Sequence, residues 1–262
     1  MDLGLKGKKV IVTGASKGLG FAMARVMAQE GAVVVINSRD EANLRSAADR
    51  LQQSNFTVHA VAGDVSQPEV PASVVSQAAE KMGGIDILIT NAGGPRTGKF
   101  VQLSDGDWAQ AVDLCLMSHV RLIRAALPFL GKSQQGSVLT VTSISAKQPI
   151  PDLILSNTLR AGVLGLTKSL ALELADQNIR VNSILPSWTA TERAVQLIRS
   201  RAEANGTSLD AEMEMQKSAA PLGRLAEPEE FARSAVFLCS PAASYLTGVM
   251  LSVDGGSYKG LL

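Results

Sequence analysis

The stretch Thr13-Gly14-Ala15-Ser16-Lys17-Gly18-Leu19-Gly20 follows a short apolar run and leads directly into a helical pattern. Each glycine has a use in that setting. Gly14 lets the chain turn sharply, Gly18 permits close backbone approach to a pyrophosphate, and Gly20 allows tight helix packing. The N-terminus of the following helix presents free N–H groups to the anion. The stretch therefore predicts the strand, turn and helix of a dinucleotide-binding unit.

Outward from this stretch, short apolar and β-branched runs alternate with segments of helical length. The runs lie at 10–13, 32–36, 57–62, 85–90, 137–142, 180–185 and 250–253. Apolar residues at helical spacing occur in segments 18–30, 40–53, 68–82, 104–130, 156–176 and 228–239. The alternation predicts an α/β fold whose parallel sheet is covered by helices on both faces. No linker divides residues 1–262, so we expect one domain.

Residues 187–224 do not fit this alternation, because they are longer than an ordinary loop and rich in Glu, Arg, Ala and Met. Such an insert in a compact enzyme is often a lid or a binding loop. We therefore expect a substrate loop or lid within the domain. The alternative is a pair of amphipathic helices in which Met213 and Met215 simply pack.

Composition excludes several classes of protein. Apolar residues make up 46% and charged residues 19%, the reverse of a disordered chain. Lys and Arg total 25 against 24 Asp and Glu, so the net charge of +1 predicts neither nucleic acid nor membrane partners. No signal peptide and no run of the ~20 apolar residues that a membrane helix needs are found, so we expect a soluble, cytoplasmic protein. Cys115 and Cys239 lack metal or disulfide spacing, and we expect buried free thiols and no metal site.

The end of the second predicted strand bears on the choice of cofactor. The chain reads Ser38-Arg39 there, with no carboxylate before Asp40. A carboxylate would hold the ribose 2′-hydroxyl of NAD, whereas a guanidinium can pair with the 2′-phosphate of NADP. Arg39, with Lys17 as a second nearby cation, therefore favours NADP(H) over NAD(H). The alternative is that both are solvated loop charges.

Further along the chain, Asp64-Val65 follows the third predicted strand, Asn91-Ala92-Gly93 follows the fourth, and Arg180-Val181-Asn182 precedes Pro186 and Thr191. Pro221-Leu222-Gly223-Arg224 and Asp254-Gly255-Gly256 come later. Together with the glycine-rich loop, these segments resemble the short-chain dehydrogenase/reductase family, in particular its 3-oxoacyl-acyl-carrier-protein reductases, over essentially the whole length. The resemblance implies a single Rossmann-type, doubly wound domain of about seven parallel strands, an NAD(P) cofactor, a small-molecule substrate and a homotetramer or homodimer.

The residues expected to bind the cofactor follow from the loop, the strand end and this resemblance. In chain order they are Thr13, Gly14, Ser16, Lys17, Gly18, Leu19, Gly20, Ser38, Arg39, Asp64, Val65, Asn91, Ala92, Gly93, Arg160, Pro186 and Thr191.

The catalytic positions depart from the family pattern. The family uses a tyrosine that gives a proton to the carbonyl oxygen and a lysine that follows one helical turn later. The resemblance puts Ser156 and Arg160 at those positions, and Ser143 at the position of the family's serine. Cys115 stands where the family has an asparagine, and Ser187 where it has a glycine. The expected catalytic set is therefore Ser143, Ser156, Arg160 and Cys115.

These replacements change the available chemistry. An aliphatic hydroxyl is far less acidic than a phenol, whose reference pKa is about 10, so Ser156 is not expected to act as a general acid. Arg160 faces the same way as Ser156 and can anchor the cofactor or stabilise a developing oxyanion. Core packing is the simpler explanation of Cys115.

Another side chain could supply the proton in place of Ser156. The side chains that could enter the cleft are Asn157, Arg96, Lys99 and Lys147, although loop charges are usually solvated. His59 and His119 are expected to be packed or surface histidines.

Two functions stay open as well. One is an NADP-dependent oxidoreductase with an atypical site that acts on a small carbonyl, such as a 3-oxoacyl group, an iminium or an alcohol. The other is a catalytically silent protein on the same fold that binds NADP(H) as a sensor or structural ligand. The intact glycine loop argues against a third possibility, an interaction protein that merely keeps the fold.

Overall fold

A single parallel sheet organises the computed structural model, which describes residues 1–261. Within these residues its seven strands run in the order β3-β2-β1-β4-β5-β6-β7. The strands are β1 (Lys9–Val12), β2 (Val33–Ser38), β3 (Val58–Ala62), β4 (Ile87–Thr90), β5 (Gly136–Val141), β6 (Ile179–Pro186) and β7 (Met250–Val253). The order reverses between β1 and β4, and in such sheets ligands bind beyond the carboxyl ends of the strands at this point. The expected architecture of about seven parallel strands in one α/β domain is confirmed.

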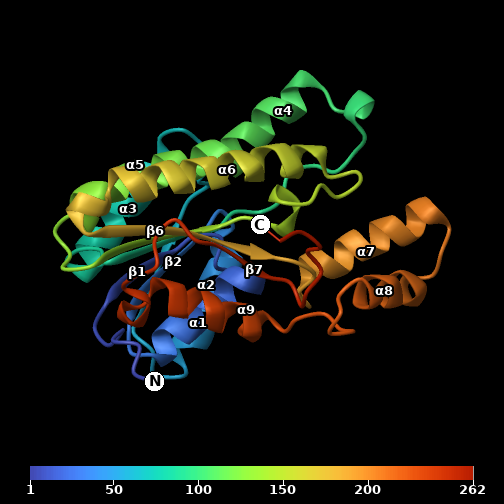
Figure 1. The fold of residues 1–262 in the computed structure, drawn as a ribbon. Helices are drawn as coiled ribbons and strands as arrows, with labels where there is room; N and C mark the ends of the chain where they lie inside the picture. The colour runs from blue at the N-terminus through green and yellow to red at the C-terminus, as the bar shows by residue number, and fades with distance from the viewer. Residues whose placement is uncertain (262) are drawn as a thin grey trace.

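Helices cover both faces of the sheet (Figure 1). One face carries α1 (Gly18–Gln29), α2 (Glu41–Gln52) and α9 (Pro228–Cys239), and the other carries α3 (Val70–Met82), α5 (Ser118–Leu130) and α6 (Ile154–Glu173). Side chains alternate along a strand, so β1 serves both cores. Val10 and Val12 pack beneath α1 and α9, while Ile11 packs beneath α3 and α5. Burial on both faces explains why the strand reads as an unbroken apolar run.

The helical segment expected at 104–130 has an irregular centre. It begins with α4 (Asp105–Val112), continues through a π-helical turn at Asp113–Met117 and ends with α5. Ser104 caps α4 by accepting a hydrogen bond from Asp107 N. π-helical turns are rare in proteins, but those that occur often lie at functional sites. Cys115 lies in this one.

Residues 187–224 contain two helices, α7 (Glu192–Asn205) and α8 (Leu209–Ser218), which extend beyond the sheet in Figure 1. The alternative of two helices matches this segment, but its packing of both Met213 and Met215 does not hold for Met215, which is 55% exposed. Instead α8 buries Glu212, whose Oε1 accepts hydrogen bonds from Asn205 Nδ2 at 2.8 Å and Thr207 Oγ1 at 2.9 Å. These two bonds lower the pKa of Glu212. A polar network, rather than an apolar stripe, therefore fixes the turn between the helices.

No helix within residues 1–261 is both long enough and apolar enough to cross a lipid bilayer.

Candidate active site

The glycine-rich loop lies at the carboxyl end of β1, pressed against the turn that follows β4. Gly14 and Gly18 both adopt φ of +58°, in the left-handed region that favours glycine. A Cβ atom on Gly14 would lie 2.7 Å from Asn91 O, and one on Gly20 would lie 2.2 Å from Gly14 O. The loop therefore has no room for side chains at these two positions.

Asn91 fastens the loop in place. Its Nδ2 donates to Thr13 O at 3.2 Å and to Gly14 O at 3.0 Å. Thr13 Oγ1 donates to Asn91 O at 2.8 Å and accepts from Asn91 N at 2.9 Å. These contacts join the ends of β1 and β4 at the point where the strand order reverses. The predicted loop and the predicted Asn-Ala-Gly turn thus form one unit.

The N-terminus of α1 behind this loop is open to an anion. Its N-cap residue, Lys17, makes no side-chain capping bond, and its first turn holds no acidic residue. By contrast, α2 is capped by Asp40, which accepts from Asn43 N at 2.9 Å. Uncapped N–H groups and the helix dipole together favour a bound phosphate.

The first turn of α7 lies over the glycine loop. A Cβ atom on Gly18 would be 3.6 Å from the methyl group of Thr191. Lys17 Nζ lies 3.1 Å from Glu192 Oε2 in an exposed ion pair. The positive charge expected to help bind a 2′-phosphate is therefore shared with α7, although an exposed pair of this kind is weak. Pro186 ends β6 just before this segment.

The residues predicted to bind the adenosine lie at the carboxyl ends of β2 and β3. Ser16 Oγ donates to Ser38 Oγ at 3.1 Å. Arg39 is exposed and, within the described part of the chain, has no hydrogen bond or ion pair. Asp64 Oδ1 accepts from Ser66 N at 3.0 Å and Ser66 Oγ at 2.8 Å, while Val65 packs into the core. Arg39 is thus free to bind an anion at this edge.

Three serines are linked by hydrogen bonds where β5 ends and α6 begins. Ser143 Oγ accepts from Ser145 N at 3.1 Å, and Ser145 Oγ lies 3.1 Å from Ser156 Oγ. The structure thus brings the predicted Ser143 and Ser156 together through the buried Ser145, which sequence reasoning missed. The only signal for Ser145 was its place two residues after Ser143.

Arg160 lies one helical turn beyond Ser156 and is only 6% exposed. Its Nη1 donates to Val141 O at 2.8 Å and its Nη2 to Gly93 O at 3.3 Å, whereas its Nε has no partner. No carboxylate of the described residues pairs with it. A buried guanidinium without a counter-ion is costly, so this site favours an anionic group or negative charge that develops beside it.

Cys115 and His119 lie on the inner side of this site and are completely or almost completely buried. Burial raises the pKa of the Cys115 thiol, although Arg160 and Arg193 oppose the effect. His119 Nδ1 lies 2.7 Å from Thr90 Oγ1, and its Nε2 has no partner. Burial, with a contribution from Arg160, lowers the pKa of His119 to about 3. At neutral pH both side chains are therefore uncharged, and His119 is packed as expected.

Three of the other proposed proton donors form hydrogen bonds elsewhere. Arg96 Nη1 donates to both carboxylate oxygens of Asp107 at 3.0 and 2.9 Å. Asn157 exchanges two hydrogen bonds with the main chain of Ile150. Lys147 Nζ donates to Met250 O at 3.3 Å. The fourth, Lys99, lies on an exposed loop. His59, which was expected to be packed or at the surface, lies half-buried on β3.

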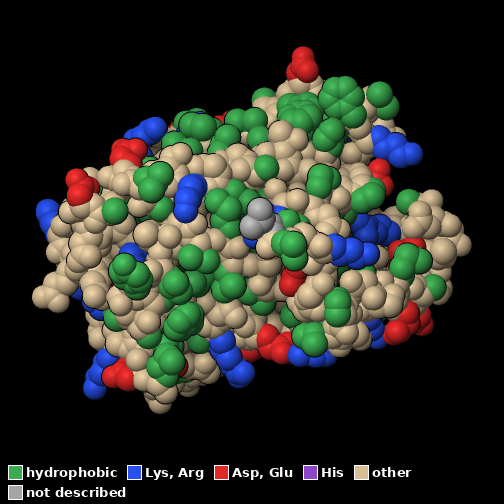
Figure 2. Space-filling model, viewed as in Figure 1, with side chains coloured by type: hydrophobic (Ala, Val, Ile, Leu, Met, Phe, Trp, Pro, Cys, Tyr) green, Lys and Arg blue, Asp and Glu red, His purple; other side chains and the backbone are tan. Residues whose placement is uncertain are grey.

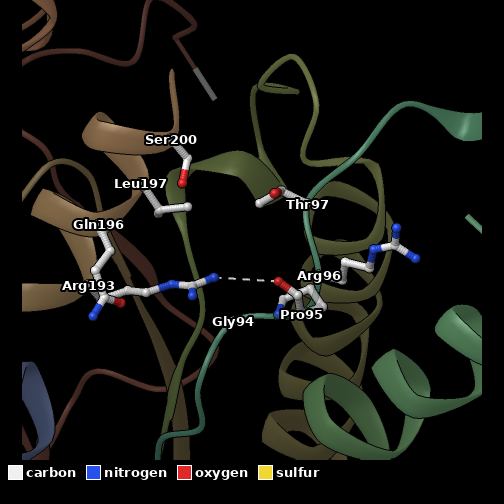
Figure 3. Close-up of a pocket in the computed structure, with 8 residues that line it drawn as sticks. All are labelled: Gly94, Pro95, Arg96, Thr97, Arg193, Gln196, Leu197 and Ser200. Carbon is white, nitrogen blue, oxygen red and sulfur yellow. Dashed lines mark hydrogen bonds between the residues drawn. The ribbon is translucent and has the colours of Figure 1, made fainter. Parts of the chain in front are cut away.

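A cavity of ≈ 380 Å³ opens between the loop after β4 and α7 (Figure 3). Its lining residues are Gly94, Pro95, Arg96, Thr97, Arg193, Gln196, Leu197 and Ser200. Arg193 reaches across it and its Nη2 donates to Pro95 O at 3.4 Å, while Arg96 points away (Figure 3). Figure 2 shows Lys and Arg side chains around the hollow between α4 and α7, with Asp and Glu side chains among them. Sequence reasoning missed Arg193, because nothing in the chain order places α7 beside residues 94–97.

Comparison with known proteins adds an independent observation. The family model described as Enoyl-(Acyl carrier protein) reductase matches residues 14–258. The chain is 36% identical over 258 residues to dehydrogenase/reductase SDR family member 4 of Bos taurus, which covers 98% of this chain and 89% of that protein.

Two solved structures have the same fold over nearly their whole length. The L-sorbose reductase of Gluconobacter frateurii, complexed with NADPH and L-sorbose, matches with a TM-score of 0.95, 35% identity and 100% coverage of both chains. An NADPH-bound short chain oxidoreductase of Pseudomonas aeruginosa PAO1, which contains an atypical catalytic center, matches with a TM-score of 0.88 and 32% identity over 97% of this chain and 98% of that one.

Proposed function

The chain belongs to the short-chain dehydrogenase/reductase family, and we propose that it is an NADP(H)-dependent oxidoreductase with an altered catalytic site. Its substrate would be a small carbonyl compound or the corresponding alcohol, and the protein would be a cytoplasmic homo-oligomer. One observation carries the proposal: the glycine loop fastened by Asn91 lies at the same sheet edge as the Ser143, Ser145 and Ser156 hydroxyls.

The residues present fit a dinucleotide. The cradle at Gly14 and Gly20 excludes side chains, and the uncapped N-terminus of α1 suits a pyrophosphate. Asp64 and Ser38 would meet the adenosine end, while Asn91, Pro186 and Thr191 would meet the nicotinamide end. The bound cofactor would supply or accept the hydride.

NADP is favoured over NAD by the strand end at Ser38. Arg39 is exposed and without a partner in the described chain, and no carboxylate is placed there to hold a ribose 2′-hydroxyl. A guanidinium matches a phosphate group bidentately. The two solved structures reported above, both NADPH complexes, lend support.

In the proposed reaction the chain positions and polarises the carbonyl more than it protonates it. The hydroxyls of Ser143 and Ser156 would donate hydrogen bonds to the carbonyl oxygen, with Ser145 orienting them. The charge of Arg160 would stabilise the negative charge that develops on that oxygen. Water would supply the final proton, since Cys115 is buried and neutral. An iminium carbon is already cationic and would need no acid at all.

A silent cofactor-binding protein is the second candidate. It is favoured by the hydrogen bonds of Arg160 to Val141 O and Gly93 O, which occupy donors that could otherwise bind a ribose. Equilibrium titration with NADPH, followed by NADPH oxidation with a panel of ketones, aldehydes and cyclic imines, tests both candidates. Turnover supports the oxidoreductase, binding without turnover supports the silent protein, and failure to bind contradicts both.

A further inference from the structure

The cavity between residues 94–97 and α7 carries a positive charge that nothing in the described chain neutralises. Of the arginines near it, Arg96 is paired with Asp107. Arg193 has only the 3.4 Å bond to Pro95 O, and no ion pair within the described residues. No lining residue is acidic. The cavity therefore attracts anions at the free end of the Arg193 side chain.

Arg160 adds a second positive charge behind the cavity wall. Its Nη2 donates to Gly93 O, and the next residue, Gly94, lines the cavity. Arg193 contacts the same loop, because a Cβ atom on Gly94 would lie 3.1 Å from its Nη2. Arg160 is buried, without a counter-ion, and has an unpartnered Nε. Arg160 and Arg193, neither of which forms an ion pair with a described residue, thus both contact the loop that follows β4.

The remaining lining residues suit a compact organic acid. Pro95 and Leu197 offer apolar surface, while Thr97, Gln196 and Ser200 offer small polar groups. A volume of ≈ 380 Å³ falls at the lower end of the range typical of small-molecule sites. A guanidinium fork binds a planar carboxylate through two parallel hydrogen bonds.

We propose that the substrate of this site is an oxo acid, or its hydroxy-acid counterpart, whose carboxylate is bound by Arg193. This inference rests on the proposed oxidoreductase function. Arg193 acts as a specificity-determining residue: it selects the substrate and fixes its acidic end, while the carbonyl faces Ser143 and Ser156.

The test compares acids with their neutral esters. NADPH oxidation is measured with 2-oxobutanoate, 3-oxobutanoate and 4-oxopentanoate, each beside its methyl ester. Charged hydrogen bonds predict a kcat/KM about 10- to 100-fold higher for the best acid than for its ester. Arg193→Gln should remove this preference by lowering kcat/KM for the acid alone, and Arg193→Lys should restore part of it. Equal rates for acids and esters in the unmodified chain would overturn the inference while leaving the oxidoreductase function intact.

Arg199→Gln is the matched control, since Arg199 is exposed on the same helix and does not line the cavity. It removes the same charge, so an equal loss of acid preference in this variant would mean that only the general field acts, which contradicts a binding role for Arg193. Circular dichroism checks that all three variants keep α7 folded.

Calorimetry separates this inference from the function on which it rests. Binding of the same acids, but not their esters, with loss in Arg193→Gln, supports the carboxylate site even if no NADPH is consumed, an outcome that would contradict the oxidoreductase. Competition by inorganic phosphate but not by acetate would overturn the carboxylate assignment.

Discussion

Arg39 is the single residue on which the choice between the two nicotinamide cofactors depends. Arg39→Asp should abolish or reverse a preference for NADPH over NADH, with a change in relative affinity of about 10- to 100-fold, because a charge-assisted pair with the 2′-phosphate is replaced by repulsion. Fluorescence titration with NADPH and with NADH measures the ratio of the two affinities. Arg124→Asp, the same change at an exposed arginine on α5, should leave the ratio unaltered. Equal affinities in the unmodified protein would contradict the account.

Ser156 and Arg160 form the altered pair at the proposed catalytic position. Changing Ser156→Tyr together with Arg160→Lys should raise carbonyl reduction by more, in free energy, than the two single changes summed. The tyrosine would supply an acid, and a nearby compact charge would lower its pKa. Neighbours that act as a unit are expected to be non-additive.

Initial rates on the substrate panel measure this coupling, with NADPH affinity and Tm recorded beside them because a phenol could overpack the space next to Ser145. Single effects that simply add would count against the coupling. A double variant that binds NADPH yet stays inactive would favour the silent protein.

At the level of elements, the junction of β1 with α1 depends on close packing at Gly20. Gly20→Ala should lower the free energy of unfolding by about 1–3 kcal/mol and weaken NADPH binding, since the added Cβ would lie 2.2 Å from Gly14 O. Gly165→Ala on α6 is the control, because no atom lies within 4 Å of its added Cβ. There the helix should gain up to about 1 kcal/mol. Urea denaturation measures the free energy of unfolding of both variants and of the unmodified protein. If Gly20→Ala were as stable as the unmodified protein, the glycine loop would be able to relax around the added Cβ atom.

The elements that sequence patterns predicted best are those with strong periodicity. The strands and five of the six helices flanking the sheet were expected within a few residues of their observed bounds, because burial on two faces leaves a clear apolar pattern in β1 and its neighbours. The sixth, α5, was expected only as the end of one helical segment at 104–130. The π-helical turn at Asp113–Met117 was not foreseen, because it differs from the surrounding α-helix in its hydrogen bonds, which join residues i and i+5, and the sequence does not display these bonds. The nature of 187–224 stayed open because the α7–α8 turn is fixed by Glu212, a polar residue.

The candidate site shows the same division. Glycines at fixed spacing carry a geometric meaning in the sequence, so the loop from Thr13 to Gly20 and its Asn91 partner were predictable. Ser145 and Arg193 were not, because each enters the site through a tertiary contact rather than a pattern along the chain.

For the whole molecule, His119 predicts how stability depends on pH. Burial lowers its pKa to about 3 in the folded protein, from the usual histidine value of 6.5. Below pH 6.5 the unfolded chain binds a proton at His119 that the folded chain does not bind. The stability contributed by neutral His119 is therefore fully present above about pH 6.5 and decreases as the pH falls towards 3. Between about pH 7 and about pH 5 we expect a loss of about 1–2 kcal/mol in the free energy of unfolding.

The chain offers its own control, because it contains only 2 histidines. In urea titrations at the two pH values, His59→Gln should keep the loss and His119→Gln should reduce it. The window lies above the range in which carboxylates titrate. A His119→Gln variant that retains the full loss would show that another group is responsible.

The central claim, hydride transfer at an altered site, is tested most directly by following the hydride itself. The protein is incubated with NADPH deuterated at the transferring carbon and with the panel of oxo acids, ketones and imines, and the products are examined by mass spectrometry. We expect a reduced product that carries deuterium at the former carbonyl or iminium carbon, formed in proportion to the NADPH consumed. Tight binding of the deuterated cofactor with no deuterium in any product would contradict it.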